Sequence, residues 1–328
     1  MADSPPPAQL VGDLAKAHIA ARCLHVVAAF GVADAIDERP TDPREIGART
    51  GLDPDSVARI LRLLAAHGVF ESSPGGYSHN AASHLLRSDH PESLRSYVRM
   101  TGMPAFWNRF TELTESARTG RPSVDWRGLI AYFEQHPDES EIFNAAMVAK
   151  SRSVLPAVVA AYDFGPFGVI ADIGGGRGHL LAAILERAPR THGILFELPH
   201  VAADAAAARS ARLEIVAGDL FTSALPAADL YVLMDLLHDW RDDDAARILS
   251  SVRRAAPTHA RLLIVETLVP EAPGPHFGKT LDLIMLAVTG GRERTRAQHA
   301  ALLERAGFRL ERVLSTGSEY SIVEAVAT

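Results

Sequence analysis

The chain of 328 residues is long enough for about two domains with a sizeable core. It is 47% hydrophobic and 22% charged, which is ordinary for a globular protein, and its net charge of −7 gives no general affinity for nucleic acid or anionic membranes. We therefore expect neither as a partner. The longest apolar run, Leu283–Val288, is far shorter than the roughly 20 residues that span a bilayer. The single cysteine, Cys23, cannot form an internal disulfide and predicts a reducing, cytoplasmic location.

The amino-terminal region predicts a short tail followed by a helical domain. Residues 1–10 lack the basic flank and apolar core of a signal peptide, so we expect a flexible tail there. Residues 11–95 show apolar side chains at helical spacing and then a helix-turn-helix pattern. Two short strands, Gly68–Glu71 and Gly76–His79, follow on either side of a Pro-Gly-Gly turn. This order predicts a winged-helix-like domain.

The winged-helix outline leaves two functions open. DNA-binding helix-turn-helix modules share it, so a regulator that senses a cofactor and binds DNA is one interpretation. Residues 41–80, however, contain four arginines, no lysine and five acids, so the basic surface that DNA binding requires is missing. We therefore favour packing or dimerisation by this domain.

Residues 96–160 predict a further helical segment, which we assign to the second, catalytic domain of residues 96–328. The segment is rich in large apolar side chains at helical spacing. Such side chains usually form plain core, but aromatic and methionine side chains also line pockets for flat substrates. The residues concerned are Met100, Met103, Phe106, Trp107, Phe110, Phe133, Phe143 and Met147.

From about residue 165, apolar runs and amphipathic helices alternate, which predicts an α/β domain with a doubly wound, Rossmann-like parallel sheet. Its first strand leads into Asp172-Ile173-Gly174-Gly175-Gly176-Arg177-Gly178. Gly174 and Gly176 can adopt backbone angles that side chains forbid, which lets the main chain approach a ligand. A pyrophosphate site would need glycine at the position of His179, and Asp172 would repel a diphosphate. Because Asp172 can attract a cationic amino-acid group, the turn predicts a site for S-adenosylmethionine.

Two further acids follow the next two strands. Glu197 ends the second strand, where a carboxylate can accept hydrogen bonds from both ribose hydroxyls of the cofactor. Asp219 follows the third strand and would meet the adenine amino group, with Leu220 and Phe221 against the ring. Each acid could instead cap a helix. Acids after three successive strands favour the cofactor site.

The fourth strand, Asp229–Met234, leads to His238. Ligands of open parallel sheets bind beyond the carboxyl ends of the strands, so we expect His238 to face the cofactor. A histidine with a pKa of about 6.5 can accept the proton of a phenol, whose pKa is about 10. Glu266 ends the fifth strand and can hold the second ring nitrogen, while Glu293 can support the ring from the opposite face. The alternatives are a histidine bonded to backbone and a solvated loop acid at position 293.

The end of the chain and the other histidines complete the prediction. The last two apolar runs, Phe308–Leu314 and Tyr320–Val326, predict a terminal antiparallel hairpin, which departs from the dinucleotide-binding fold and fits a methyltransferase sheet. His79, His84 and His90 lack the helical pairing and neighbouring acids of a metal site. We therefore expect no metal.

The chain resembles the small-molecule S-adenosylmethionine-dependent O-methyltransferases related to caffeic acid and hydroxyindole enzymes, whose bacterial members modify aromatic natural products. The resemblance covers about residues 11–320. It rests on five segments in the same order, which are Asp172–Gly178, Glu197–Val201, Gly218–Phe221, Leu237–Trp240 and Gly290–Thr295.

The resemblance implies methyl transfer to a hydroxyl of an aromatic small molecule, release of S-adenosylhomocysteine, and a homodimer formed by the amino-terminal domain. It implies His238 as catalytic base between Glu266 and Glu293. Some members of the family keep the fold and cofactor but decarboxylate or hydroxylate instead, which stays open as an alternative. The predicted substrate contacts are Trp107, Phe143, Asn144, Met147, Asp239 and Met285, and the predicted cofactor contacts include Ser151 and Met234.

Three departures from the family pattern affect the expected site. Glu197 replaces the more usual aspartate, which keeps the charge and lengthens its reach. Met234 stands where relatives often carry lysine or arginine near the adenine, so an apolar contact would replace a polar one. The stretch from Met285 to Gly290 is a residue shorter than in plant relatives, which affects the wall of the predicted pocket.

Overall fold

The computed structural model describes residues 5–328 and divides into two compact units. The first unit comprises Met1–Trp107 and Phe133–Lys150, and the second comprises Asn108–Tyr132 and Ser151–Thr328. The segment predicted to line the substrate site, residues 96–160, is therefore shared between the two units. Each unit has its own core and is described by itself.

The first unit begins with the long helix α1, which starts at Pro7. Proline suits the first position of a helix because its missing N–H has no partner there in any case. The flexible tail predicted for residues 1–10 is therefore wrong from residue 7 onward, and residues 1–4 lie outside the described part of the chain. The helices that follow are η1 (Val32–Ala35), α2 (Pro43–Thr50), α3 (Pro54–Ala66), α4 (Ala81–His84), α5 (Arg95–Gly102) and α6 (Pro104–Thr111).

A small hairpin of two strands, β1 (Glu71–Ser73) and β2 (Gly76–Ser78), follows α3. The predicted strand pair is present, but its first strand begins at Glu71 and not at Gly68. Gly68 has a φ of 78°, and the amide of Val69 donates to the carbonyl of Leu64, so these residues still terminate α3. The core beneath the hairpin includes Val27, Ile46, Leu61, Phe70 and Tyr77.

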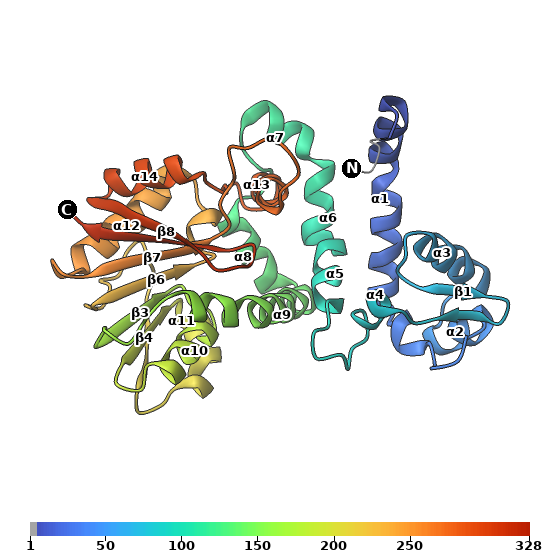
Figure 1. Cartoon of the computed structure of the whole chain (residues 1–328), viewed down its shortest axis with the longest axis horizontal. Helices are drawn as coiled ribbons and strands as arrows, with labels where there is room; N and C mark the ends of the chain where they lie inside the picture. Colours follow the sequence, from blue (N-terminus) through green and yellow to red (C-terminus); the bar gives the residue numbers. More distant parts are fainter. Residues whose placement is uncertain (1–4) are drawn as a thin grey trace. The chain divides into compact units, whose positions relative to one another are not determined.

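The second unit is built on a seven-stranded sheet with the order β5-β4-β3-β6-β7-β9-β8 (Figure 1). Five strands run parallel, and the last two form an antiparallel hairpin that joins the sheet through β9. The predicted doubly wound sheet with a terminal hairpin is confirmed. The strands are β3 (Val169–Ile173), β4 (His192–Glu197), β5 (Leu213–Ala217), β6 (Leu230–Met234), β7 (Arg261–Glu266), β8 (Phe308–Ser315) and β9 (Ser321–Ala327).

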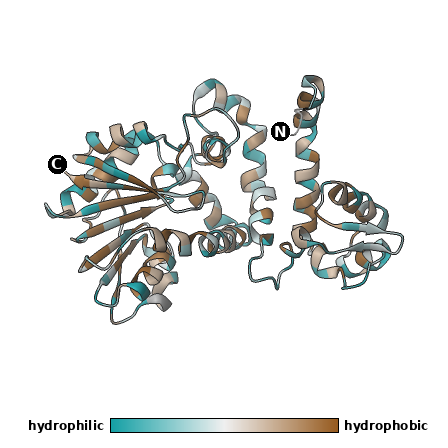
Figure 2. Cartoon of the chain, viewed as in Figure 1, coloured by the Kyte–Doolittle hydropathy of each residue, from teal (hydrophilic) through white to brown (hydrophobic). Residues whose placement is uncertain are grey.

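Helices cover both faces of this sheet, which explains why its central strands β6 and β7 are apolar over most of their length (Figure 2). α12 and α14 contribute Ile248 and Leu303 to one core layer, and α9 and α10 contribute Val158 and Ile184 to the other. The remaining helices are α7 (Leu113–Thr119), α8 (Trp126–Gln135), α9 (Pro137–Ala161), α10 (His179–Arg187), α11 (Pro199–Asp204), η2 (Ala205–Ala208), η3 (Leu237–Asp239), α12 (Asp242–Ala255), α13 (Phe277–Val288) and α14 (Arg296–Arg305).

Helix α9 has 25 residues and, by length and composition alone, is apolar enough to cross a membrane. One such helix is weak evidence for a membrane span, because core helices of globular proteins meet the same criterion. Leu155, Val158 and Val159 of this helix belong to the core layer beside the sheet. Packing inside the protein therefore accounts for the apolar side chains in this part of the helix.

Candidate active site

Five of the predicted site residues, four acids and His238, lie at or just beyond the carboxyl ends of the parallel strands. Parallel strands place these ends at one edge of the sheet, which is where open α/β sheets bind ligands. Asp172 lies in β3, and Glu197 and Glu266 are the last residues of β4 and β7. Asp219 and His238 follow β5 and β6. The topology alone brings these five side chains to the same edge.

Asp172 is a buried carboxylate that lacks a partner. It is 1% exposed, and neither of its oxygens has a hydrogen-bond partner among the described residues. Burial, followed by the nearby charge of Glu197, raises the pKa of Asp172 to about 7. An isolated buried carboxylate is costly unless a cationic or hydrogen-bonding ligand completes it. The unpartnered carboxylate of Asp172 therefore suits the cationic amino group predicted to bind it.

The glycine turn after Asp172 has the backbone conformation that the spacing predicted. Gly174 and Gly176 have φ values of 70° and 58°, which other residues rarely adopt. Gly175 was not among the predicted contacts, yet a Cβ at this position would lie 2.3 Å from Oδ2 of Asp172. The middle glycine therefore keeps the space around the carboxylate free.

Glu197 already accepts two hydrogen bonds from the backbone. Its Oε2 accepts from the amide of Gly176 at 3.0 Å, and its Oε1 accepts from the amide of Leu198 at 2.7 Å. Burial raises the pKa of Glu197, while these two amides act in the opposite direction. The side chain thus ties the glycine turn to the end of β4, and its predicted contact with the ribose stays a prediction.

The residues expected around the adenine are half-buried. Oδ1 of Asp219 accepts a hydrogen bond from the amide of Phe221 at 2.7 Å, so one oxygen stabilises its own turn. Leu220 packs beside the core layer of α12 and α14, and Met234 beside the layer of α9 and α10. Ser151 lies within α9. Their contacts with the cofactor stay predictions.

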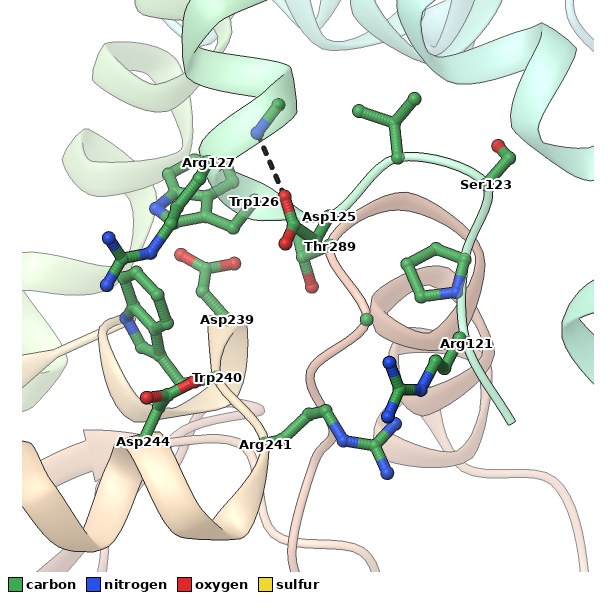
Figure 3. Close-up of a pocket in the computed structure, with 14 residues that line it drawn as sticks. Arg121, Ser123, Asp125, Trp126, Arg127, Asp239, Trp240, Arg241, Asp244 and Thr289 are labelled. Carbon is green, nitrogen blue, oxygen red and sulfur yellow. Dashed lines mark hydrogen bonds between the residues drawn. The ribbon is translucent and has the colours of Figure 1, made fainter. Parts of the chain in front are cut away.

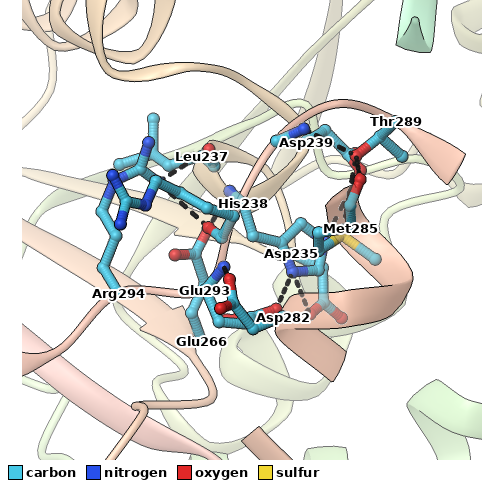
Figure 4. A network of polar contacts seen from close by, with 12 residues as sticks. Asp235, Leu237, His238, Asp239, Glu266, Asp282, Met285, Thr289, Glu293 and Arg294 are labelled. Atoms are coloured by element: carbon cyan, nitrogen blue, oxygen red, sulfur yellow. Dashed lines mark hydrogen bonds and ion pairs between the residues drawn. The ribbon is translucent and has the colours of Figure 1, made fainter. Parts of the chain in front are cut away.

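His238 lies in the short helix η3, and its ring is held by Glu293 (Figure 4). The ring atom Nδ1 is 2.7 Å from Oε1 of Glu293, whereas Oε1 of Glu266 accepts from the backbone amide of His238 at 2.9 Å. The predicted contact of Glu266 with the ring is therefore wrong, because Glu293 occupies that position. Glu293 is 1% exposed, which also excludes the alternative of a solvated loop acid.

Two more carboxylates surround the same ring. Oδ1 of Asp235 is 3.9 Å from Nδ1 of His238, and Oδ1 of Asp239 is 3.9 Å from Nε2. Burial alone would lower the pKa of His238, but the charges of Asp239, Glu293 and Asp235 outweigh it and raise this pKa to about 10. Burial likewise raises the pKa of Glu266 to about 7. In the absence of ligands, His238 is therefore mainly protonated at neutral pH.

Arg294 fixes the chain on both sides of His238, and sequence reasoning gave it no role. It is fully buried and donates hydrogen bonds to the carbonyls of Leu237 and Trp240 and to Oδ1 of Asp242. The signal for this residue was its place in the segment Gly290–Thr295, directly after Glu293.

The glycine pair at positions 290 and 291, just before Glu293, allows the loop after α13 to approach η3 closely. A Cβ at Gly291 would lie only 1.9 Å from the carbonyl oxygen of His238, so no side chain fits there. The amide of Arg292 donates to the same oxygen at 2.8 Å. On the other side, Oδ1 of Asp282 accepts from the amide of Glu293 at 3.0 Å. These contacts fix both partners of the pair formed by His238 and Glu293.

A pocket of about 670 Å³ lies beside Asp239 in the second unit (Figure 3). The guanidinium of Arg127 stacks 4.7 Å from the ring of Phe221 and 5.4 Å from that of Trp240, which gives this wall an aromatic and cationic character. Asp239 is the one predicted substrate contact in its lining. The lining consists of Arg121, Pro122, Ser123, Val124, Asp125, Trp126, Arg127, Gly128, Asp239, Trp240, Arg241, Asp244, Thr289 and Gly290.

The other predicted substrate contacts are distributed over both units. Met285 of the second unit is 7% exposed, and its sulfur is 3.8 Å from Oγ1 of Thr289. In the first unit, Trp107 meets His25 edge-on at 5.1 Å. Phe143 packs against Phe106 and Phe133 at 6.1 and 5.0 Å, and Asn144 and Met147 are half-buried. The part that these side chains play in substrate binding stays a prediction.

The described residues contain no group of three or more His, Cys, Asp or Glu side chains that could hold a metal ion. His79, which the sequence did not favour as a ligand, is bonded to Ser83 and to the carbonyl of Ala33 and stacks on His84 at 4.6 Å.

Comparison with known families identifies the chain. An O-methyltransferase domain model matches residues 110–309, and an O-methyltransferase dimerisation domain model matches residues 13–89. The chain belongs to the O-methyltransferase family defined by these two domains. The resemblance inferred from the sequence is confirmed, and the amino-terminal helical domain is a dimerisation domain of this family.

Individual relatives agree with this assignment. The phenazine O-methyltransferase PhzM of Lysobacter antibioticus is 41% identical over 92% of this chain and 91% of its own length. The crystal structure of LaPhzM has a TM-score of 0.90 at 38% identity and covers 99% of this chain and 100% of that one. The O-methyltransferase NcsB1 from neocarzinostatin biosynthesis, solved with S-adenosylmethionine and 2-hydroxy-5-methyl naphthoic acid, has a TM-score of 0.81 at 31% identity and covers 94% of this chain and 96% of that one. The protein is an S-adenosylmethionine-dependent O-methyltransferase.

Proposed function

We propose that this enzyme methylates a hydroxyl group of an aromatic natural product and that His238 is its general base. The observation that carries the proposal is the 2.7 Å contact between Nδ1 of His238 and Glu293. This contact occupies one ring nitrogen and leaves Nε2 for the acceptor. The relative NcsB1 was solved with a hydroxylated naphthoic acid, which supports an aromatic acceptor.

Each residue around His238 has a distinct part in the proposed reaction. S-adenosylmethionine, when bound, would supply a methyl group from a cationic sulfur, and its sulfur–carbon bond would break to leave S-adenosylhomocysteine. Nε2 of His238 accepts the proton of the acceptor hydroxyl while the oxygen of that hydroxyl forms the new bond to the methyl carbon. Glu293 accepts the Nδ1–H hydrogen bond and stabilises the imidazolium that results. Glu266 and Arg294 hold the backbone of this segment in place.

The electrostatics of the site suit a phenol. The raised pKa of His238, about 10, is close to that of a phenol at about 10, so the proton moves between groups of similar basicity. A general base contributes roughly a hundred- to ten-thousand-fold in rate, and positioning of the two reactants contributes about 7–11 kcal/mol. The three carboxylates that raise the pKa of His238, those of Asp239, Glu293 and Asp235, therefore provide base strength, and the cofactor crevice provides alignment.

The cofactor is proposed to bind over the glycine turn. Asp172 would pair with its amino group, because that carboxylate is buried without a hydrogen-bond partner among the described residues. Glu197 would accept from the ribose hydroxyls, and Asp219 with Leu220 and Met234 would surround the adenine. Ser151 would complete the set from α9.

The acceptor pocket in the second unit is proposed to include Asp239 and Met285. For Trp107, Phe143, Asn144 and Met147 of the first unit, the predicted contact with the substrate stays a separate proposal. Asp239 borders the pocket of about 670 Å³ and lies 3.9 Å from Nε2 of His238, which supports its contact with the acceptor hydroxyl. The aromatic cluster around Phe143 suits a flat substrate.

We further propose a homodimer formed by the amino-terminal domain. The dimerisation domain model covers residues 13–89, and several large apolar side chains of α1 are exposed. Leu10, Val11, Leu14 and Ile19 are 47%, 68%, 69% and 47% exposed. Contiguous exposed apolar surface marks interaction sites. Light scattering on the full chain measures the oligomeric state, and the substitution Leu14→Glu is expected to yield monomers.

We also propose a cytoplasmic location, supported by the free thiol of Cys23.

The experiment that tests the proposed reaction uses methyl-labelled S-adenosylmethionine and a panel of hydroxylated aromatic compounds. Mass spectrometry is expected to find the label on an acceptor oxygen and S-adenosylhomocysteine as the second product. Loss of carbon dioxide or gain of oxygen without label would instead identify the non-methylating chemistry that some family members carry out.

A further inference from the structure

Asp235 has an unusual backbone conformation at the edge of the active site. Among residues 5–328 it is the one non-glycine residue with a positive φ, at 49°. It lies between the end of β6 and the helix η3 that carries His238. Aspartate tolerates this conformation better than most residues, but it is still uncommon and tends to occur where function requires it.

The side chain of Asp235 is fixed by a residue from a distant part of the chain. The hydroxyl of Tyr320, which directly precedes β9, lies 2.8 Å from Oδ1 and 2.9 Å from Oδ2 of Asp235. Tyr320 is only 2% exposed, so its ring is held by the core. The amide of Asp235 donates to the carbonyl of Val265 in β7. The carboxylate is therefore positioned from two neighbouring strands.

This fixed carboxylate is directed at His238. Oδ1 of Asp235 is 3.9 Å from Nδ1, the same nitrogen that Glu293 contacts at 2.7 Å (Figure 4). Both acids therefore favour a proton on the imidazole. The other charged or titratable groups packed near the ring are Asp239 at the end of η3, Glu266 at the end of β7, Asp282 in α13, Arg294 before α14 and His299 in α14.

We infer that Asp235 and Tyr320 form a positioning pair for His238. Tyr320 fixes the Asp235 carboxylate, and Asp235 orients the imidazole and strengthens it as a base together with Glu293. Asp235 acts through His238 and does not need to touch the acceptor. The inference rests on the proposed role of His238 as the base, and it adds a second carboxylate to the one that the ring contacts directly.

The test follows the protonation of His238 in the resting protein. Nuclear magnetic resonance of isotope-labelled histidine gives the midpoint of its titration, and His238→Asn identifies the signal. Asp235→Asn keeps the shape and tolerates the same backbone conformation. It is expected to lower the midpoint from about 10 by at least about 0.7 pH unit, because a full charge about 4 Å away shifts a pKa by roughly that much even in water.

Asp243→Asn is the matched control, because the Asp243 side chain is 93% exposed and pairs with Arg305 on the surface. It is expected to leave the His238 midpoint unchanged. An unmoved midpoint in Asp235→Asn, or an equal shift in the control, would overturn the inference. Because the titration needs no acceptor, its failure is separate from a failure to find methyl transfer.

The part of Tyr320 is tested by combining two substitutions. If Tyr320 acts through Asp235, Tyr320→Phe shifts the His238 midpoint in the wild-type background and has no further effect in Asp235→Asn. Equal shifts in both backgrounds, or no shift in the wild type, would contradict the pairing. The pH profile of kcat/KM is expected to move with the midpoint in each variant.

Discussion

Nδ1 of His238 lies 2.7 Å from Oε1 of Glu293, and both side chains are almost completely buried. Charge-assisted hydrogen bonds of this kind are short and are stronger than neutral ones. The pair joins the loop after α13 to the helix η3, with the glycine at position 291 allowing the two to approach. This geometry makes Glu293, and not Glu266, the direct partner of the proposed base.

Replacing Glu293 tests this assignment. Glu293→Gln removes the charge next to Nδ1, so we expect kcat to fall by about a hundredfold or more while cofactor affinity stays within about twofold. Glu304→Gln, on the exposed face of α14, is the matched control and should behave like the wild type. Steady-state kinetics and calorimetry with S-adenosylhomocysteine give both quantities. An unchanged kcat in Glu293→Gln would contradict the assignment.

Because the pKa of His238 is raised, the folding stability is expected to fall as the pH becomes alkaline. Its folded pKa of about 10 is above the unfolded value of about 6.5, so protonated His238 stabilises the native state. This contribution is complete below about pH 6.5 and is lost as the pH rises towards 10, at up to about 1.4 kcal/mol per pH unit.

Urea unfolding at a series of pH values measures this slope, with His238→Asn as the comparison. The wild type is expected to lose stability between about pH 7 and about pH 10 more steeply than the variant. Parallel curves for the two proteins would show that His238 is not strongly perturbed.

Asp172 links cofactor affinity to pH. Its pKa of about 7 means that a large fraction of the carboxyl group is neutral at slightly acidic pH. We expect S-adenosylmethionine to bind more tightly as the pH rises through 7, because only the ionised form attracts its cationic amino group. Calorimetry at pH values on both sides of 7 checks this, and Asp172→Asn should bind weakly with much less pH dependence. Equal affinities in the wild type across this range would argue against the contact.

Gly175 gives a steric test of the same site. A Cβ there would lie 2.3 Å from Oδ2 of Asp172, so Gly175→Ala must displace the carboxylate. We expect cofactor affinity to fall by about tenfold or more, at a modest cost in stability. In the control Gly75→Ala, the new Cβ would meet Pro40 at an ordinary 3.5 Å. Equal cofactor affinities in Gly175→Ala, the control and the wild type would show that the turn does not need its middle glycine.

The sequence predicted the sheet well because its strands are short apolar runs between glycine turns and helices. The predicted strands Asp229–Met234 and Phe308–Leu314 each differ from the observed β6 and β8 by one residue at one end. The positions of Asp172 and His238 could be predicted equally well, since the carboxyl ends of parallel strands define the edge of the sheet where ligands bind.

The contacts within the site could not be predicted in the same way. Whether Glu266 or Glu293 meets the ring depends on how the loop after α13 folds over η3, and no local pattern encodes that. Tyr320 and Asp235 are also far apart in the chain and meet only through the order of β6, β7 and β9. Pairings of this kind are a property of the tertiary structure.

The most direct test of the proposed base is the single-turnover rate of methyl transfer as a function of pH, in the wild type and in His238→Ala. The wild-type rate is expected to rise from about pH 7 towards about pH 10 as His238 loses its proton, and the variant is expected to be at least about tenfold slower at neutral pH with unchanged cofactor affinity. A variant with the wild-type rate and the same pH profile would contradict the role of His238 and leave positioning as the source of catalysis.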